Sequence, residues 1–355
     1  MSKKIAAWFL LLIAVLSASA SLAQEGQEVA SSGTVPASWS LTGIQHIYQG
    51  WNNCGPATVT MGLTYFGFKN DQYPAAQWLK PNSEDKNVSP WQMVDYVNNQ
   101  VGGTVKAVLR SGGTLDRLKQ LISNNFVVII EEGYDPPGKN LGWMGHYLLI
   151  SGYDDGAQQF TSQDSYEGPN VMVPYAQESS FWEHFNHLYL VLYDGSREAE
   201  LMALLGDDAD ARQNSYNALV QATNDAKANP QDAFAWFNIG TNYTALGDYD
   251  RAAAAYDQAR NLGLPWRMMW YQFGPFEAYY HMQRYQDMID LAQANLNDGG
   301  GQYVEETFYY GGLAREGLGE NDRAISNFNG ALTFNPNFTP ARDARDALAA
   351  KINGG

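Results

Sequence analysis

The C-terminal part of the chain repeats itself, and this repetition limits which folds residues 195–352 can adopt. Gly312 follows Gly240 by 72 residues, which is two periods of about 36 residues. Aromatic residues recur at the same offset, as Tyr256 and Phe328 do. Alanine is dense here, and runs of β-branched residues are almost absent. The pattern predicts stacked helix pairs, because small residues let paired helices approach closely and aromatic residues fill the groove between neighbouring units.

These helix pairs resemble the tetratricopeptide repeat (TPR), a helix–turn–helix unit of about 34 residues. The resemblance rests on AWFNIGTNYTALGDYDRAAAAYDQARNLGLP and FYYGGLAREGLGENDRAISNFNGALTFNP, with two fainter units before and between them. It implies an all-α TPR superhelix over residues 233–352, preceded at 195–232 by linker helices or a degenerate unit. Such a superhelix implies a protein partner, and a purely structural scaffold is the alternative.

The first residues predict a signal peptide. The stretch MSKKIAAWFLLLIAVLSASASLAQ places Lys3 and Lys4 before a short apolar run that ends in small residues. We therefore expect residues 1–23 to be removed and the chain to be exported as a secreted, periplasmic or cell-surface protein. The apolar run is short for a membrane span, so we expect no span after cleavage. Residues 24–41 are mostly small or polar and predict a flexible leader.

The charge balance narrows the choice of partners. The chain has 22 Lys and Arg against 38 Asp and Glu, a formal net charge of −16, which opposes binding to nucleic acid or to anionic membrane surfaces. We expect peptide or protein partners instead. Residues 42–194 mix short apolar runs, helical stretches and many turn residues, so the sequence predicts an α+β domain there.

Cys54 is the only cysteine of the chain, so it has no partner for an internal disulfide. The stretch CGPATVTMGLTYFG predicts a helix, because Pro56 suits the first helical position, apolar residues follow at steps of four and three, and Gly67 ends it. Cys54 then lies at the amino end of the helix, where the helix dipole favours the thiolate. A buried, unreactive cysteine is the alternative.

A nucleophilic cysteine needs an imidazole that accepts its proton, and His146 is the best placed histidine. The stretch HYLLISGYDDGAQQFTSQDS predicts two strands joined by a turn. A hairpin centred near Asp155 places Asp164 opposite His146, so that the carboxylate fixes the tautomer of the ring. A slip of one residue would turn the carboxylate to the other face of the sheet.

An oxyanion that forms during acyl transfer needs hydrogen-bond donors. The backbone N–H of Cys54 supplies one. The side-chain amide of Gln49 is the best placed second donor, and the two asparagines before the cysteine are alternatives. Trp51 and Trp143 flank these residues in the sequence, and we expect both to line the substrate-binding surface.

The stretches QGWNNCGPA and GHYLLISGYDD, followed by an aspartate that ends the next strand, resemble the C39-like branch of the papain-like cysteine peptidases. The resemblance covers about residues 42–193 and implies an α+β papain-like fold. The family often has proline after the aspartate, where this chain has serine. The site residues that the resemblance implies are Cys54 as nucleophile, His146 as general base and acid, Asp164 as the carboxylate that orients the ring, and Gln49 as oxyanion donor.

No cofactor is implied by these motifs. His184 and His187 share a helix face in FWEHFNH, which is a spacing that suits a metal pair. Because no third histidine or carboxylate is evident beside them, we expect no metal site.

The sequence therefore predicts an exported, C39-like cysteine peptidase that cleaves peptide or amide bonds, with a TPR region for protein interaction. The alternative is a non-catalytic, peptidase-like scaffold that binds peptides and recruits partners through its repeats. Acyl transfer to an amine uses the same residues as hydrolysis, so the sequence leaves both open.

Overall fold

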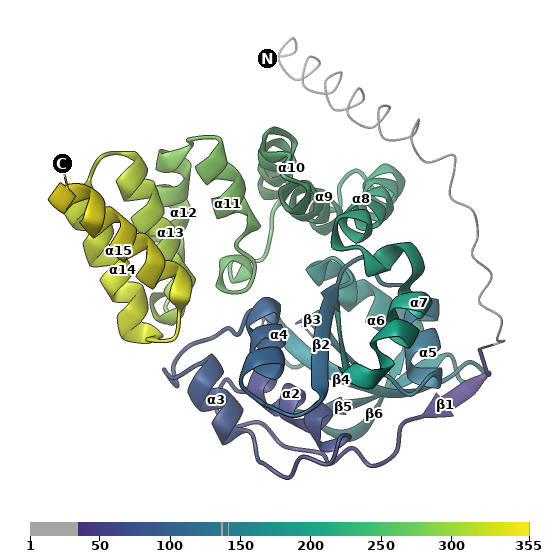
Figure 1. Cartoon of the computed structure of the whole chain (residues 1–355). Coiled ribbons are helices and arrows are strands. Elements are labelled where there is room, and N and C mark those ends of the chain that lie inside the picture. Colours follow the sequence, from purple (N-terminus) through teal and green to yellow (C-terminus); the bar gives the residue numbers. More distant parts are fainter. Residues whose placement is uncertain (1–34, 136–137, 141, 355) are drawn as a thin grey trace.

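The computed structural model describes residues 35–135, 138–140 and 142–354. It consists of a sheet-containing N-terminal domain, up to residue 194, and a helical C-terminal part. Figure 1 shows the C-terminal helices curving over one side of the N-terminal domain. None of the helices in the described ranges combines the length and the apolar character that a membrane crossing needs. The expected signal peptide lies outside the described residues.

One antiparallel sheet forms the centre of the N-terminal domain. Its strands follow the order β2-β7-β3-β4-β5-β6, and β1 pairs with the end of β4 that is not covered by β3. The strands are β1 (Ser38–Ser40), β2 (Val105–Arg110), β3 (Val127–Tyr134), β4 (Met144–Asp154), β5 (Gln159–Asp164), β6 (Gly168–Pro174) and β7 (Tyr189–Asp194).

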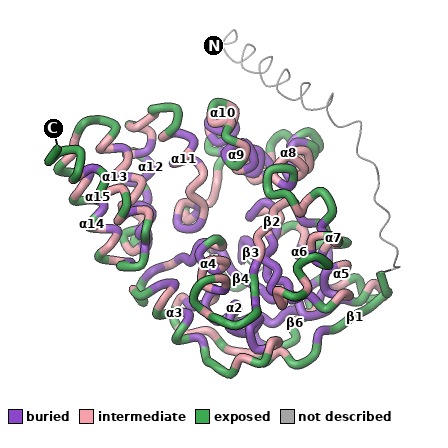
Figure 2. The backbone as a smooth tube through the Cα atoms, viewed as in Figure 1, coloured by how far each residue is buried: buried purple, intermediate pink, exposed green. Residues whose placement is uncertain are grey.

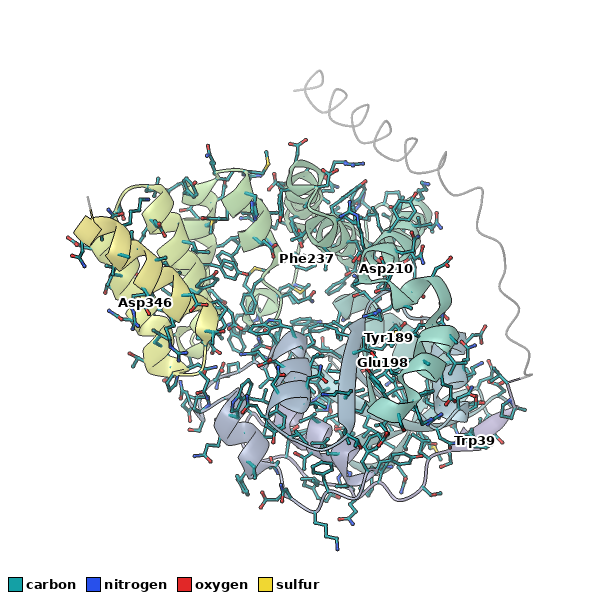
Figure 3. The ribbon with its side chains drawn as sticks, in the orientation of Figure 1. Trp39, Tyr189, Glu198, Asp210, Phe237 and Asp346 are labelled. Atoms are coloured by element: carbon teal, nitrogen blue, oxygen red, sulfur yellow. The ribbon has the colours of Figure 1, made fainter. Side chains whose placement is uncertain are left out.

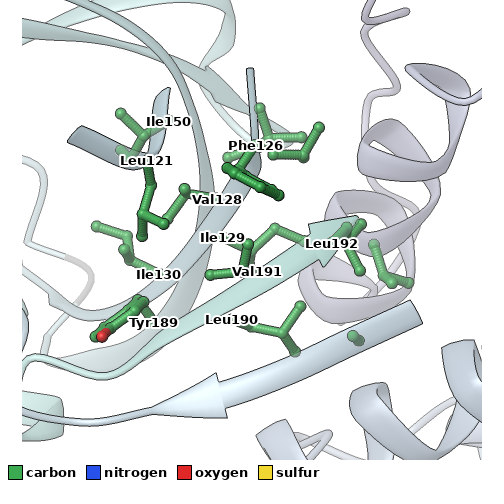
Figure 4. Close-up of a cluster of buried hydrophobic side chains, with 14 of the residues drawn as sticks. Leu121, Phe126, Val128, Ile129, Ile130, Ile150, Tyr189, Leu190, Val191 and Leu192 are labelled. Carbon is green, nitrogen blue, oxygen red and sulfur yellow. The ribbon is translucent and has the colours of Figure 1, made fainter. Parts of the chain in front are cut away.

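Strand β3 lies in the middle of the sheet and is buried along its whole length. Its run of β-branched residues, Val127 to Ile130, has side chains on both faces of the sheet and none of them is exposed. Figure 4 shows Ile129 in one apolar cluster with Leu192 of β7, and Figure 2 shows the central strands as the buried part of the domain. This core fixes the position of β4, which is hydrogen-bonded to β3.

Helix α2 (Cys54–Thr64) contacts β3 and β4, and every residue after its first is buried. It begins two residues before the predicted start and ends three residues before Gly67. A Cβ atom at Gly62 would lie 2.5 Å from Cδ1 of Leu192, so a glycine is needed for this close approach to the sheet. The other helices of the domain are α3 (Tyr73–Leu79), α4 (Pro90–Asn99), α5 (Leu115–Ser123), α6 (Tyr175–Trp182) and the 3-10 turn η1 (Glu183–Phe185).

Strand β1 corrects the prediction that residues 24–41 form a flexible leader. Residues 24–34 lie outside the described ranges, but Ser38–Ser40 pair with β4. The indole Nε1 of Trp39 donates a hydrogen bond to the side chain of Asn125 (3.3 Å), and Leu41 is buried in the core. Figure 3 shows Trp39 at the edge of the domain, away from Asp346 near the C-terminus. The segment is ordered because it completes the sheet, which its small and polar composition does not reveal.

The C-terminal part is a series of helix pairs. In two of them the same packing recurs: a Cβ atom at Gly240 would lie 2.7 Å from Cδ1 of Tyr256, and one at Gly312 would lie 2.5 Å from Cε1 of Phe328. We call α8 to α15 the repeat region. The helices are α7 (Glu198–Leu205), α8 (Ala211–Ala228), α9 (Ala233–Leu246), α10 (Tyr249–Leu262), α11 (Gly274–His281), α12 (Tyr285–Asn297), α13 (Glu305–Gly317), α14 (Asn321–Phe334) and α15 (Thr339–Gly354).

The repeat region is hydrogen-bonded to the N-terminal domain at two separate places. The first place brings α8, α9 and the chain before α11 against η1 and the loops beside it. The second involves the chain around α3 and α4 and the helices from α13 onwards (Figure 1). Among the hydrogen bonds at the first place are Asn238 Nδ2 to the Glu183 carbonyl (2.8 Å) and Gln272 Nε2 to the His184 carbonyl (2.8 Å). At the second place Ser89 Oγ donates to Glu306 Oε1 (3.1 Å) and Asn337 Nδ2 donates to the Trp78 carbonyl (3.0 Å).

Three buried carboxyl groups meet at the second of these places. Asp85 belongs to the N-terminal domain, whereas Glu305 and Glu306 begin α13, and each is at most 3% exposed. Burial, together with the charge of Glu305, raises the pKa of Glu306 well above its ordinary value. Burial and the charges of both glutamates do the same to the pKa of Asp85. The interface therefore favours the neutral form of Asp85 and of Glu306.

We expect the stability of the protein to fall as these groups ionise. A carboxyl group whose pKa is raised by folding keeps its proton in the folded state at a pH where the unfolded chain has lost it. Its contribution to the free energy of unfolding is therefore fully present at low pH and is lost as the pH rises through the raised pKa. Between about pH 5 and about pH 8, the free energy of unfolding of Glu306→Gln should therefore fall less than that of the wild type, as measured by urea denaturation. Asp322→Asn, which removes an exposed carboxyl of α14, should retain the wild-type slope. Equal slopes for Glu306→Gln and the wild type would contradict this prediction.

Candidate active site

Cys54 is the first residue of α2, and the residue as a whole is partly exposed. The backbone amides of Gly55 and Tyr147 face the sulfur atom, and the positive end of the helix dipole lies there as well. All three favour a negative charge on sulfur. Tyr147 is held in place because its hydroxyl donates to the Val88 carbonyl (2.7 Å).

His146 lies on β4 and connects Cys54 with Asp164. Its Nε2 atom is 2.8 Å from Oδ1 of Asp164, the last residue of β5, and its ring also hydrogen-bonds the Cys54 thiol. Since Nε2 is used by the carboxylate, Nδ1 is the nitrogen left for sulfur. His146 is 4% exposed and Asp164 is 3% exposed, so water competes little for this bond. The structure thus brings the three predicted residues into one chain of contacts.

The charges of the three groups support one another. Burial opposes the thiolate, but the hydrogen bond and charge of His146 outweigh it and hold the pKa of Cys54 below its ordinary value. Burial also opposes the imidazolium, yet Asp164 and Cys54 hold the pKa of His146 well above its usual range. The pKa of Asp164 is lowered, against burial, by His146 and by the backbone amides of Tyr166 and Glu167. The arrangement therefore favours a thiolate–imidazolium pair.

The register of the β4–β5 hairpin differs from the predicted one. Asp164 lies opposite Leu148, two residues away from the predicted partner His146, because the hairpin turns about one residue later than expected. The carboxylate still reaches the ring, since residues two apart on a strand point to the same face. A bulge between Ile150 and Gly152 shifts the register by one residue and so sets which face Asp164 occupies.

Gln49 is hydrogen-bonded to Ser165, the residue that follows Asp164. Its backbone N–H donates to the Ser165 carbonyl (2.8 Å), and its side-chain oxygen accepts a hydrogen bond from Ser165 Oγ (2.9 Å). The amide NH₂ group is then the end of the side chain that remains available as a donor. The serine that stands where the family often has proline is thus the residue that fixes the orientation of Gln49.

The two predicted substrate-binding tryptophans have different surroundings. Trp51 is 67% exposed, and Nζ of Lys86 lies 5.3 Å from the centre of its ring. Trp143 is only 9% exposed and packs on Phe185 and Tyr271 in the cluster that joins the two parts of the protein. Trp143 is therefore mostly covered by its neighbours, whereas Trp51 is open to solvent.

His184 and His187 are occupied by hydrogen bonds with other side chains. Trp143 Nε1 donates to Nδ1 of His184 (3.0 Å), and Nδ1 of His187 is 3.1 Å from the side-chain amide of Gln221. Burial lowers the pKa of each histidine to about 4, so both rings are neutral. Within the described ranges, the structure contains no group of histidine, cysteine and acidic residues arranged to hold a metal ion.

The sequence analysis missed two buried carboxyl groups behind His146. Glu132 of β3 lies directly opposite His146, and Glu178 of α6 faces Glu132. Burial raises the pKa of Glu132 to about 7, although the nearby imidazolium lowers it, and burial with the charge of Glu132 raises that of Glu178 well above its usual value. The signal for Glu132 was present in the sequence, because two glutamates interrupt an otherwise apolar buried strand.

Comparisons with known proteins identify both parts of the chain. Residues 41–190 match the sequence model of the Peptidase_C39 like family, and residues 235–260 match that of the tetratricopeptide repeat. A crystal structure described as that of a C39-like peptidase from Bacillus anthracis shares 16% sequence identity, covers 45% of this chain and 98% of its own, and gives a TM-score of 0.35. No curated protein matches the chain.

The chain therefore contains a C39-like domain at residues 41–190 and a tetratricopeptide repeat at residues 235–260, as the sequence predicted. The antiparallel sheet with its covering helices and the helical C-terminal part agree with the predicted α+β papain-like fold and all-α repeat.

Replacing His146 should remove the activation of the thiol. In His146→Ala the burial of Cys54 persists without the imidazolium, so the pKa of the thiol should rise. Alkylation by iodoacetamide at about pH 6 should then slow by roughly tenfold or more, since each unit of pKa changes the thiolate fraction by that factor. Because Cys54 is the only cysteine, the label reports on this site alone.

The control for this experiment is His281→Ala, which removes an exposed histidine that stacks on Tyr249 in the repeat region. This variant should react at the wild-type rate. If His146→Ala reacts as fast as the wild type at about pH 6, the imidazole does not stabilise the thiolate.

Proposed function

We propose that the protein is a cysteine peptidase or a closely related hydrolase of amide bonds. The observation that carries the proposal is the chain of contacts from Asp164 through His146 to the thiol at the start of α2. A structural cysteine needs neither a charged partner nor a lowered pKa, whereas a nucleophile needs both.

The reaction begins with the proton of the Cys54 thiol on Nδ1 of His146. The thiolate attacks the carbonyl carbon of the substrate, and the carbonyl electrons move to oxygen. The imidazolium then donates its proton to the leaving nitrogen, the C–N bond breaks, and an acyl group remains on sulfur. Water attacks this thioester while His146 accepts a proton from it, and the acid and the free thiol are released.

Asp164 acts on this sequence through His146 and not on the substrate. Its hydrogen bond with Nε2 keeps a proton on that nitrogen, so Nδ1 is the nitrogen that exchanges a proton with sulfur. Its negative charge also stabilises the imidazolium that forms when the thiol ionises. The oxyanion is held by the backbone N–H of Cys54 and by the side-chain amide of Gln49.

The decisive test is an acyl group on Cys54. After incubation with a series of peptide esters and rapid acid quenching, mass spectrometry of the intact wild-type protein should show the added mass of the acyl group. Cys54→Ala should gain no mass, and its thermal unfolding should remain cooperative. Binding of the same peptides without any acyl mass would instead support the non-catalytic, peptide-binding scaffold.

A second prediction concerns Gln49. Replacing it by Ala removes an oxyanion donor and should lower kcat by about 10²–10³-fold for any ester that acylates the wild type. Alkylation of Cys54 by iodoacetamide forms no oxyanion and should be unchanged. An equal loss in both assays would show that Gln49 supports the fold of the site and not the oxyanion.

Export and partner binding complete the proposal. The pattern of residues 1–23 supports an exported protein, and sequencing of the mature N-terminus from each cell fraction tests it. The TPR units support an interaction with a protein or peptide chain.

A further inference from the structure

The two longest links between helix pairs of the repeat region both contact the C39-like domain. Residues 263–273 join α10 to α11, and residues 298–304 join α12 to α13, whereas the links at 229–232 and 335–338 have only four residues each. Figure 1 shows the first long link extending from the helices toward the N-terminal domain. These links interrupt the repeat where its sequence is most degenerate.

Tyr271 of the first long link lies against the strand that carries His146. A Cβ atom at Gly145 would be 2.7 Å from Cδ1 of Tyr271, so the tyrosine ring occupies the space beside Gly145. Its ring centre is 5.8 Å from that of Trp143, and Gln272 anchors the same link through the His184 carbonyl. The ring is thus held one residue away from the proposed general base.

Tyr271 is also close to the nucleophile. Burial raises the pKa of its hydroxyl, and the charge of the Cys54 thiolate raises it further, which places the phenol within electrostatic range of sulfur. Cys54 is only partly exposed, and His146 is 4% exposed. Access to the thiol is therefore restricted, and Tyr271 is a repeat-region side chain that lies against the strand of His146.

The second long link contacts the C39-like domain through Lys86. Lys86 lies between two aromatic rings, 5.3 Å from the centre of Trp51 and 5.8 Å from that of Tyr303. Trp51 is three residues before the cysteine, and Tyr303 belongs to the repeat region. The repeat region therefore also meets the C39-like domain at Lys86, which lies beside Trp51.

We propose that Tyr271 is a specificity-determining residue of the Cys54 site, so that the repeat region forms one wall of this site and limits its substrates to narrow, extended peptide segments. The substrate class in this inference, a peptide, rests on the proposed function. Its test, however, needs no turnover, because it measures how large a reagent can reach the thiol.

The experiment compares the alkylation rates of Cys54 with iodoacetamide and with a bulky fluorescein maleimide. The quantity compared is the rate with the maleimide divided by the rate with iodoacetamide. In the native wild type, this ratio should be much lower than in the urea-unfolded chain. Tyr271→Ala should raise the native ratio by about tenfold, the rate equivalent of relieving a modest steric clash. Tyr271→Phe keeps the ring and should behave as the wild type.

Trp266→Ala is the matched control, since it removes a 58% exposed aromatic side chain from the same link and should leave the ratio unchanged. If Tyr271→Ala does not fold, Tyr271→Leu takes its place in the assay. The comparison of native and unfolded wild type also remains as a test of restricted access. Equal ratios in the native and unfolded wild type, or an unchanged ratio in the folded Tyr271 variants, would overturn the inference. If the rate ratios are as expected but Cys54 gains no acyl group, the role of Tyr271 in restricting access would stand and the proposed peptidase function would be wrong.

Discussion

The hydrogen bond between His146 and Asp164 depends on one extra residue in β4. Near the turn, Gly152 pairs with Thr161, and continuing that register would place Asp164 opposite Leu149, on the face that His146 does not share. The bulge at Ser151 moves Asp164 opposite Leu148 and returns it to the correct face. The charge of the imidazolium, and through it the lowered pKa of the thiol, follows from this local irregularity.

The sequence contained the strands, the turn and the helix start, but not the bulge. Alternation along HYLLISGYDD predicts a strand, and nothing in the alternation marks Ser151 as the extra residue. The predicted pairing of Asp164 was wrong by two residues, which left the face unchanged. Strand β1 was missed for a related reason, since Ser38–Ser40 are ordered by pairing with β4 and not by their own composition.

Three buried glutamates lie near Cys54 or His146, and their protonation states affect how well the site stabilises the thiolate. Glu131 of β3 is 1% exposed, and burial raises its pKa well above the ordinary value. Glu132 and Glu178 lie behind His146, also with raised pKa values. If these groups were all ionised, their charges would oppose the thiolate. The domain thus places in the same core a cation that favours the thiolate and acids whose neutral form is favoured by burial.

The departures of the repeat region from a regular array lie where it meets the C39-like domain. A regular TPR array needs only short links, because each helix pair packs on the next. Here the links that contain Tyr271 and Tyr303 are longer, and each places an aromatic ring against the C39-like domain, Tyr271 at Gly145 and Tyr303 at Lys86. This arrangement was not predictable from the repeat pattern, which describes contacts between units and not contacts with another domain. A partner protein of the repeats would have to bind the surface that the C39-like domain leaves free, because the side that carries Tyr271 is already packed on the domain.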